Sequence, residues 1–245
     1  MKSTILLFTA FLFISLLSCG GGETVRVATK AGSPGKKIIL EVVPGPEWTH
    51  LFLGVKGAGI MTPPQFVIWA EDTVGNLLDT LYVTGKYAYQ SWMSAEERPS
   101  TVPYWGFKMA GKDAKKPYAP SKYKPLDTIS SATPQAGFVL ESVVPETADG
   151  IVVLGEFNVS LDFNEFYQNY LSPDDIYYSG KNGDGGQPAI VYHALLLPED
   201  GTNWVQLALA GHSSPSGADG GLYTNLAGLT TGLGMIKSIQ VRYAE

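Results

Sequence analysis

Short runs of apolar and β-branched residues, each bounded by turn-forming residues, constrain the fold of this chain most strongly. Residues 37–43 (KIILEVV) lie between Ser33-Pro34-Gly35 and Pro44-Gly45-Pro46. Such runs are typical of buried β-strands, because β-branched side chains fit a pleated sheet and Gly and Pro favour turns. Comparable runs recur along the sequence, and we expect further strands at residues 50–55, 65–70, 77–84, 138–144, 188–197, 204–210 and 235–243.

The connections between these runs predict part of the pairing. Residues 65–70 and 77–84 are joined by a Gly/Asn turn and predict a hairpin, and 188–197 with 204–210 predict a second hairpin-like pair. Residues 150–163 indicate two strands about a bend at Gly155. The aromatic spacing of residues 163–171 (FNEFYQNYL) favours a short helix, and 104–109 (YWGFKM) one additional strand.

The composition agrees with a globular protein built from sheets. The chain has 245 residues, 44% hydrophobic and 16% charged, which is enough for a hydrophobic core. Its 28 Gly, 16 Pro and 11% aromatic residues favour turns and strands over helices. We therefore expect an all-β fold, with residues 36–245 forming a β-sandwich domain that carries a long aromatic and basic loop insertion.

The charge distribution narrows the range of partners. The net charge of −6 argues against nucleic acid, because binding phosphates needs a positive surface. Residues 86–124 nevertheless hold eight Lys or Arg and three Asp or Glu, a local charge of +5. This basic segment lies just before residues 127–133 (DTISSAT).

The N-terminus has the pattern of a bacterial export signal. A positive start at Lys2 precedes a predominantly apolar run of thirteen residues, 5–17, which is too short to span a bilayer. Leu16-Leu17-Ser18-Cys19 resembles a lipobox, in which cleavage before the cysteine leaves a thiol that receives a lipid. This pattern predicts a signal peptide at residues 1–18, a lipid anchor and flexible linker at 19–35, and a location in the cell envelope, periplasmic or on the cell surface. Cys19 is the only cysteine, so an intramolecular disulfide is excluded.

Residues 86–125 form an unusually long connection with no regular periodicity. Tyrosines and tryptophans, including Tyr104 and Trp105, alternate there with Lys and Pro. One interpretation is a binding surface, on which aromatic rings stack a planar ligand and cations hold a phosphate. The other is a structural cover over the edge of the sandwich, because amphipathic side chains commonly pack on apolar surface.

A short motif follows this segment at residues 127–133 (DTISSAT). It resembles the Asp-x-x-Ser/Thr-Gly-Ala-Thr signature to which flavin transferases attach FMN through a phosphodiester. The resemblance implies that Thr133 is the acceptor, with Asp127, Ser130 and Ala132 matching and Ser131 standing where the family has Gly. A threonine hydroxyl needs an external base or metal, and small neighbours let a partner enzyme approach it. The alternative is a plain turn stabilised by Asp and Ser side chains.

A broader resemblance covers most of the chain from residue 65 onward. The order of FVIWAEDTVGNLLDTLYVTGK, a Trp-bearing segment, DTISSATPQAGFVLES, LGEFNVSLDF and IKSIQVRY is similar to predicted periplasmic proteins of the domain of unknown function 2271 family. The resemblance implies an immunoglobulin-like sandwich related to the flagellar hook-capping scaffold. It also implies that flavin transferases or membrane redox proteins are partners of some members, and it implies no enzymatic activity.

A second candidate site is the loop of residues 211–221 (GHSSPSGADGG), with His212 and Asp219 as candidate ligand-binding residues. It resembles a Gly-His-rich loop in relatives of the same family. The three histidines have no spacing typical of a metal site, the Gly-rich loops do not match an EF-hand, and a Gly-x-Ser-x-Gly elbow is absent. We therefore expect no metal.

The sequence is compatible with three functions. The first is a lipid-anchored binding or scaffold module without catalysis, associated with a membrane redox system. The second is an electron carrier with FMN attached covalently to Thr133. The third is a metal-dependent hydrolase using His193 and His212, which requires the fold to bring these two side chains together.

Overall fold

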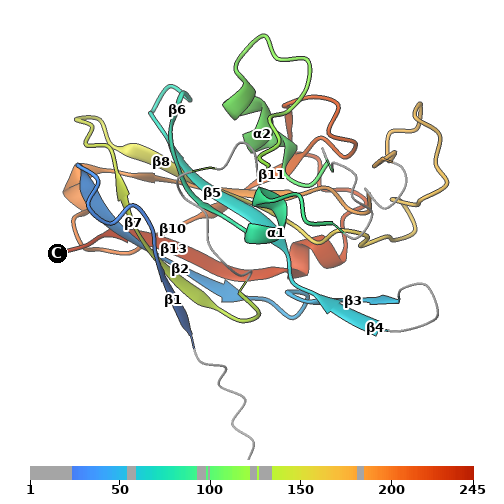
Figure 1. The fold of residues 1–245 in the computed structure, drawn as a ribbon, viewed down its shortest axis with the longest axis horizontal. Coiled ribbons are helices and arrows are strands. Elements are labelled where there is room, and N and C mark those ends of the chain that lie inside the picture. The colour runs from blue at the N-terminus through green and yellow to red at the C-terminus, as the bar shows by residue number, and fades with distance from the viewer. Residues whose placement is uncertain are drawn as a thin grey trace, which may run out of the picture.

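The computed structural model describes residues 24–53, 59–92, 98, 100–121, 126, 134–180 and 185–245. Two large sheets make up most of it (Figure 1). Sheet 1 has the strand order β1 (Val25–Ala28), β7 (Phe138–Val144), β2 (Lys36–Pro44), β13 (Ile236–Tyr243) and β10 (Val205–Gln206). Sheet 2 has the order β12 (Leu222–Tyr223), β11 (Ala208–Ser213), β9 (Ile190–Leu196), β8 (Ile151–Asn158), β5 (Gln65–Glu71) and β6 (Leu77–Val83).

The strands pair antiparallel except β1, which runs parallel to β7. A third, two-stranded sheet consists of β3 (His50–Leu53) and β4 (Gly59–Thr62), and it projects from one end of the sandwich (Figure 1). Among the described residues, no helix is both long and apolar enough to cross a membrane.

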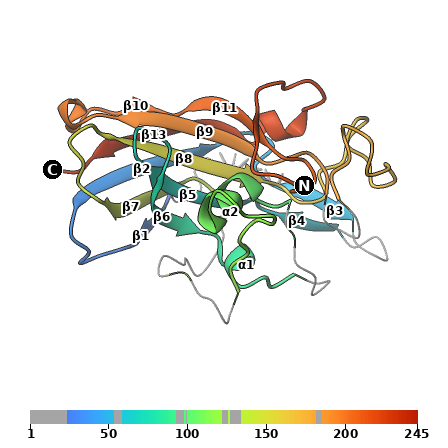
Figure 2. The same cartoon turned by 90° about the horizontal axis from the view of Figure 1, so that it is seen from above.

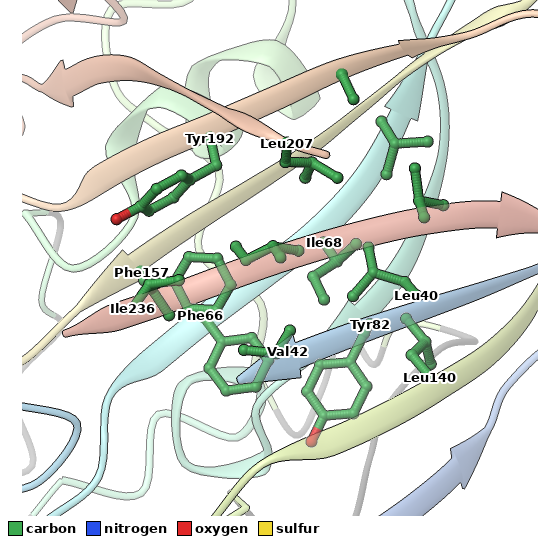
Figure 3. Close-up of a cluster of buried hydrophobic side chains, with 14 of the residues drawn as sticks. Leu40, Val42, Phe66, Ile68, Tyr82, Leu140, Phe157, Tyr192, Leu207 and Ile236 are labelled. Carbon is green, nitrogen blue, oxygen red and sulfur yellow. The ribbon is translucent and has the colours of Figure 1, made fainter. Parts of the chain in front are cut away.

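The main core lies between the two sheets. Alternate side chains of β2 (Ile38, Leu40, Val42) face those of β5 (Phe66, Ile68, Ala70), because successive residues of a strand point to opposite sides. Figure 3 shows Phe66 within a group of aromatic and aliphatic side chains from both sheets. The ring centroids of Tyr82, Phe138 and Phe157 lie 5.1, 5.2 and 4.9 Å from that of Phe66. The predicted all-β sandwich is therefore confirmed.

A second core covers the outer face of sheet 2. Residues from α1 (Gly85–Ala88), from α2 (Pro103–Ala110) and from the chain between them pack on Val67 and Trp69 of β5 and on Leu154 of β8. Figures 1 and 2 show both helices on one side of the molecule. Every residue of β5 is consequently buried, since one face meets sheet 1 and the other meets this cover.

The helix α2 contradicts the strand predicted at residues 104–109. Pro103 occupies the first helical turn, where its missing N–H is not needed, and Gly111 follows the last helical residue with a φ of 93°. The segment also covers the outer face of sheet 2 rather than an edge of the sandwich. Of the aromatic residues that suggested a strand, Trp105 is fully buried by this packing, and Tyr104 and Phe107 are partly buried.

Two local predictions around β8 are also wrong. Residues 151–158 form one continuous strand, in which Gly155 pairs with Ile68 on one side and Tyr192 on the other. Gly155 does not bend the strand. A side chain is excluded at this position because a Cβ atom would lie 2.7 Å from the ring of Phe157. Residues 163–171 contain no helix, because the Asn164 side-chain oxygen accepts the N–H groups of residues 166 and 167 in a turn.

The predicted pair of residues 188–197 and 204–210 is correct only in part. Strand β9 does pair antiparallel with β11, but Val205 and Gln206 belong to β10, which pairs with β13 in the opposite sheet. Leu207 lies between β10 and β11, with its side chain buried in the main core. The chain thus passes from sheet 1 to sheet 2 within one run that looks continuous in sequence.

The remaining expected strands are present. The strands β2, β3, β5, β6, β7 and β13 lie where apolar runs predicted them, and β5 and β6 form the predicted antiparallel hairpin.

Candidate functional site

Several predicted site residues lie outside the described part of the chain. These are Cys19 with the signal peptide, and the motif residues Asp127, Ser130, Ser131, Ala132 and Thr133. The residues on either side of the motif are described. Leu126 packs against the second core, and the Pro134 carbonyl accepts a hydrogen bond of 3.2 Å from Trp48 Nε1 in the main core.

Tyr104 and Trp105 lie in the first half of α2 and face sheet 2. The Trp105 side chain has no exposed surface, and its Nε1 donates to Thr80 Oγ1 at 3.1 Å. The half-buried Tyr104 ring lies 6.0 Å from Trp69, with Lys108 Nζ 5.4 Å from its centroid. Burial raises the pKa of the Tyr104 phenol, partly opposed by the charge of Lys108. These rings hold the cover in place, and Trp105 cannot touch a ligand without a rearrangement of α2.

Glu156 explains how α2 begins where it does. Its carboxylate is fully buried on β8 and accepts the backbone N–H groups of Tyr104 at 3.1 Å and Trp105 at 2.8 Å. An anion at a helix N-terminus satisfies N–H groups that have no partner within the helix. Burial raises the pKa of Glu156 to about 7, while the two N–H groups and the Ser213 side chain favour its charged form.

The C-terminal half of α2 is held by an ion pair. Lys108 Nζ lies 3.1 Å from Glu71 Oε2 and 2.9 Å from the Gly75 carbonyl oxygen, and Trp69 Nε1 donates to Glu71 Oε1 at 2.8 Å. Glu71 is buried and Lys108 is partly exposed. Lys108 therefore neutralises a buried carboxylate instead of facing solvent as a free cation.

Two clefts lie on either side of the loop that contains Asp219. The first, of about 750 Å³, lies between the turn after β5, the end of α2 and this loop, and its cationic side chains are Lys108, Lys112 and Lys115. The second, of about 400 Å³, lies between residues 167–178 and residues 212–227. Asp219 lines both clefts. Of the candidate residues of the sequence, His212 and Asp219 are brought together here, and Tyr104 and Trp105 are not.

His212 forms the floor of the second cleft. The imidazole is 6% exposed, with Nδ1 2.8 Å from the Ser213 carbonyl oxygen and Nε2 3.1 Å from the Asn225 carbonyl oxygen. An imidazolium donates to both oxygens, whereas a neutral ring donates to one. Neither nitrogen is directed at a serine hydroxyl, so His212 is not arranged as a base for Ser214 or Ser216.

Tyr223 lies directly above this floor, and no sequence motif singled it out. Its ring stacks on the His212 ring with 5.4 Å between centroids and 16° between planes. Its hydroxyl lies 3.0 Å from each carboxylate oxygen of Asp219, which also accepts the Gly221 N–H at 2.8 Å and the Ser214 hydroxyl at 3.4 Å. Burial and, to a smaller degree, Asp219 raise the pKa of the Tyr223 phenol. Tyr223 belongs to the site because it pairs with His212 across strands β11 and β12, and this register cannot be read from the sequence.

The opposite wall of the second cleft comes from an irregular segment. Tyr167 is buried with its ring edge-on to Tyr177 at 5.2 Å, while Ile176 is largely exposed at the cleft. Burial, with the neighbouring Tyr177, raises the pKa of Tyr167 to about 12, so this phenol stays neutral. Tyr178 and Asp175 complete the wall.

A buried polar network fixes the start of that segment. Asp162 Oδ2 accepts Gln187 Nε2 at 2.7 Å and the Thr231 hydroxyl at 2.6 Å, and His50 Nδ1 lies 3.7 Å from Asp162 Oδ1. Gln187 Oε1 accepts the Thr230 N–H at 2.6 Å. Burial is the main cause that raises the pKa of Asp162. The network joins distant parts of the chain, which is why sequence spacing did not reveal it.

The histidines do not converge in the described structure. His212 pairs with Ile190, whose side chain faces the main core, and His193 is three residues further along β9 and therefore points to the opposite face. Within the described ranges, no three His, Cys, Asp or Glu side chains are placed to hold a metal ion.

The second cleft thus combines a supported tyrosine ring with carboxylate, amide and hydroxyl groups at its rim. Such a combination of one aromatic surface and a few fixed polar groups is typical of small-molecule sites. Comparison of the chain with protein-family models, with curated proteins and with solved structures gives no match in any of the three.

Proposed function

We propose that this protein is a non-catalytic binding module of the bacterial cell envelope, held at a membrane by a lipid on Cys19, and that its ligand occupies the second cleft. The signal-like N-terminus and the lipobox-like sequence support the location. The preorganised ring of Tyr223 over His212 supports binding at the cleft, because a ring fixed before binding loses little freedom when a ligand stacks on it.

The geometry favours binding over catalysis at this cleft. Both nitrogens of His212 face backbone carbonyl oxygens, and the Ser214 hydroxyl donates to Asp219. A nucleophilic serine is commonly activated by an imidazole within hydrogen-bond reach, and neither nitrogen of His212 is placed to do so. The Asp219 carboxylate that accepts the Ser214 hydroxyl also accepts Tyr223 and Gly221. The same groups are well suited to hold Tyr223 and the cleft rim in one position.

A thermal-shift experiment tests this function. The full-length protein in detergent is heated with three classes of small molecules: neutral sugars, cationic amines and organic phosphates. We expect one class to raise Tm in a saturable manner without being converted, because a ligand that binds only the folded state stabilises it. Ala227→Trp, which fills the cleft, should abolish the shift, and Thr202→Trp at an exposed turn elsewhere should not. If no class shifts Tm, or if Ala227→Trp responds like the unsubstituted protein, the cleft is not the binding site.

A second candidate function is covalent FMN carriage on Thr133, with a flavin transferase and a membrane redox protein as partners. The motif at residues 127–133 supports it, as does the anchoring of the neighbouring Pro134 to the core, which would hold an attached group close to the sandwich. Intact mass after co-expression with a flavin transferase should then rise by one FMN phosphoester, and the mass of Thr133→Ala should not. An unchanged mass of the unsubstituted protein would remove this candidate.

A further inference from the structure

Tyr223 remains accessible although one face of its ring is covered. The residue is 41% exposed, while His212 stacks on one ring face. Asp219 holds the hydroxyl end at both carboxylate oxygens, and the pairing of β12 with β11 holds the backbone. The open face is therefore a flat, apolar platform with a fixed orientation.

The charges around this platform exclude anions. The residues that line the second cleft include the carboxylates of Asp175 and Asp219 and, in the described structure, no Lys or Arg. A phosphate or carboxylate placed here would meet like charges and no cation. The lysines of the neighbourhood line the first cleft, on the other side of Asp219.

The geometry also disfavours a cationic ligand. Aromatic recognition of an ammonium group relies on ring faces directed at the cation. Of the four tyrosines that line the cleft, Tyr167 is 2% exposed, Tyr177 and Tyr178 are partly buried, and only Tyr223 is well exposed. The carboxylate of Asp219 already accepts three donors, from Tyr223, Gly221 and Ser214.

We propose that the second cleft binds a neutral sugar residue, whose C–H face stacks on the open face of Tyr223. A pyranose has an apolar C–H face and a rim of hydroxyl groups that donate and accept hydrogen bonds. The Tyr223 platform matches the apolar C–H face of the sugar. Ser216, Asn225 and Asp175 line the cleft and supply hydrogen-bond partners for the sugar hydroxyl groups. The cleft of about 400 Å³ has room for one or two sugar rings. This inference rests on the proposed binding function and specifies its ligand class.

The test uses calorimetric titration of the full-length protein in detergent with unbranched neutral tetrasaccharides of glucose, N-acetylglucosamine, mannose and galactose. At least one tetrasaccharide is expected to bind, and Tyr223→Ala to weaken that binding about tenfold or more through loss of the stacking surface. Tyr223→Phe keeps the ring but loses the hydrogen bond to Asp219, so its affinity should lie between that of the unsubstituted protein and that of Tyr223→Ala. Tyr170→Ala removes a tyrosine that is 74% exposed outside the cleft and is the matched control.

The outcomes separate this inference from the function on which it rests. If binding survives in Tyr223→Ala, or is lost equally in Tyr170→Ala, the proposed stacking of a sugar on Tyr223 is wrong. If no tetrasaccharide binds while an amine or a phosphate raises Tm through the cleft, the sugar is wrong and the binding module stands. If no class binds at all, both fall. Circular dichroism of each variant confirms folding, which the exposed positions of Tyr223 and Tyr170 favour.

Discussion

Glu156 is the residue on which the outer cover of sheet 2 depends most directly. A charge buried in a β-sheet is unfavourable unless it is paired or hydrogen-bonded. The two N–H groups at the start of α2 supply those bonds, and in return the carboxylate determines where the helix begins. Burial still raises the pKa of Glu156 to about 7, from an ordinary value of 4.5.

This pKa predicts how stability depends on pH. Because the folded-state pKa lies above the unfolded value, the folded protein binds this proton more tightly than the unfolded chain. The resulting stabilisation is fully present below pH 4.5 and is lost as pH rises through about 7, by up to about 3 kcal/mol. In Glu156→Gln, which cannot ionise, this decline should disappear. Urea unfolding of both proteins between about pH 5 and pH 8 measures the difference.

Two comparisons make this result interpretable. Asp162, whose pKa burial also raises, is unchanged in the variant, so its contribution cancels in the difference. Glu156→Ala leaves the N–H groups of Tyr104 and Trp105 without the carboxylate and should be less stable than Glu156→Gln by about 1–3 kcal/mol. Parallel stability curves for Glu156→Gln and the unsubstituted protein would contradict the raised pKa.

Among the elements, β13 and β1 differ in how much of the sandwich depends on them. Strand β13 lies inside sheet 1 between β2 and β10 and places Ile239 and Val241 in the main core. Strand β1 lies at the edge of the same sheet, pairs with β7, and exposes most of its residues. Position in the sheet therefore decides how much each strand contributes to the main core.

A matched pair of substitutions measures this difference. Val241 of β13 is fully buried, whereas Val25 of β1 is 45% exposed. We expect Val241→Ala to lower the free energy of unfolding by about 2 kcal/mol, because it removes buried methyl groups and leaves a cavity. Val25→Ala should lower it by less than about 0.5 kcal/mol. Equal losses for the two variants in denaturant unfolding would contradict the assigned strand order.

The helix α2 shows how tertiary contacts can override the strand propensity of an aromatic segment. Tyr, Trp and Phe suit strands by propensity, yet residues 103–110 are helical because Pro103 starts the helix and Glu156 caps it from another strand. Replacing both Tyr104 and Trp105 would therefore destabilise the second core, so a loss of binding in that variant would not identify a binding surface. Side chains at the cleft rim are the better targets.

For the whole molecule, the important feature is that sheet 2 is covered on both faces. Sheet 1 buries one face and the segment around α1 and α2 buries the other, so the sandwich has two cores (Figures 1 and 2). The loop of residues 214–221 meets this cover, and a Cβ atom on Gly220 would lie 2.5 Å from Phe107. The cover and the loop together shape the first cleft, and the same loop forms one wall of the second cleft.

The sequence by itself determined the all-β class, most strand positions and the hairpin of β5 and β6. Strand periodicity, β-branched residues and turn formers act over a few residues, so they can be read locally. It also indicated the loop of His212 and Asp219 as a candidate site. The immunoglobulin-like detail, the lipid anchor and the modification of Thr133 stay predictions.

Only the tertiary structure decided which strands share a sheet, where α2 begins, and what surrounds His212. The crossing at Leu207 between the sheets, the cap of α2 by Glu156 and the stack of Tyr223 on His212 each join residues that packing brings together. Burial makes these contacts worth more than local propensity, because a buried polar group must be satisfied and a buried surface must be filled. No short stretch of sequence contains both partners of such a contact together with the register that aligns them.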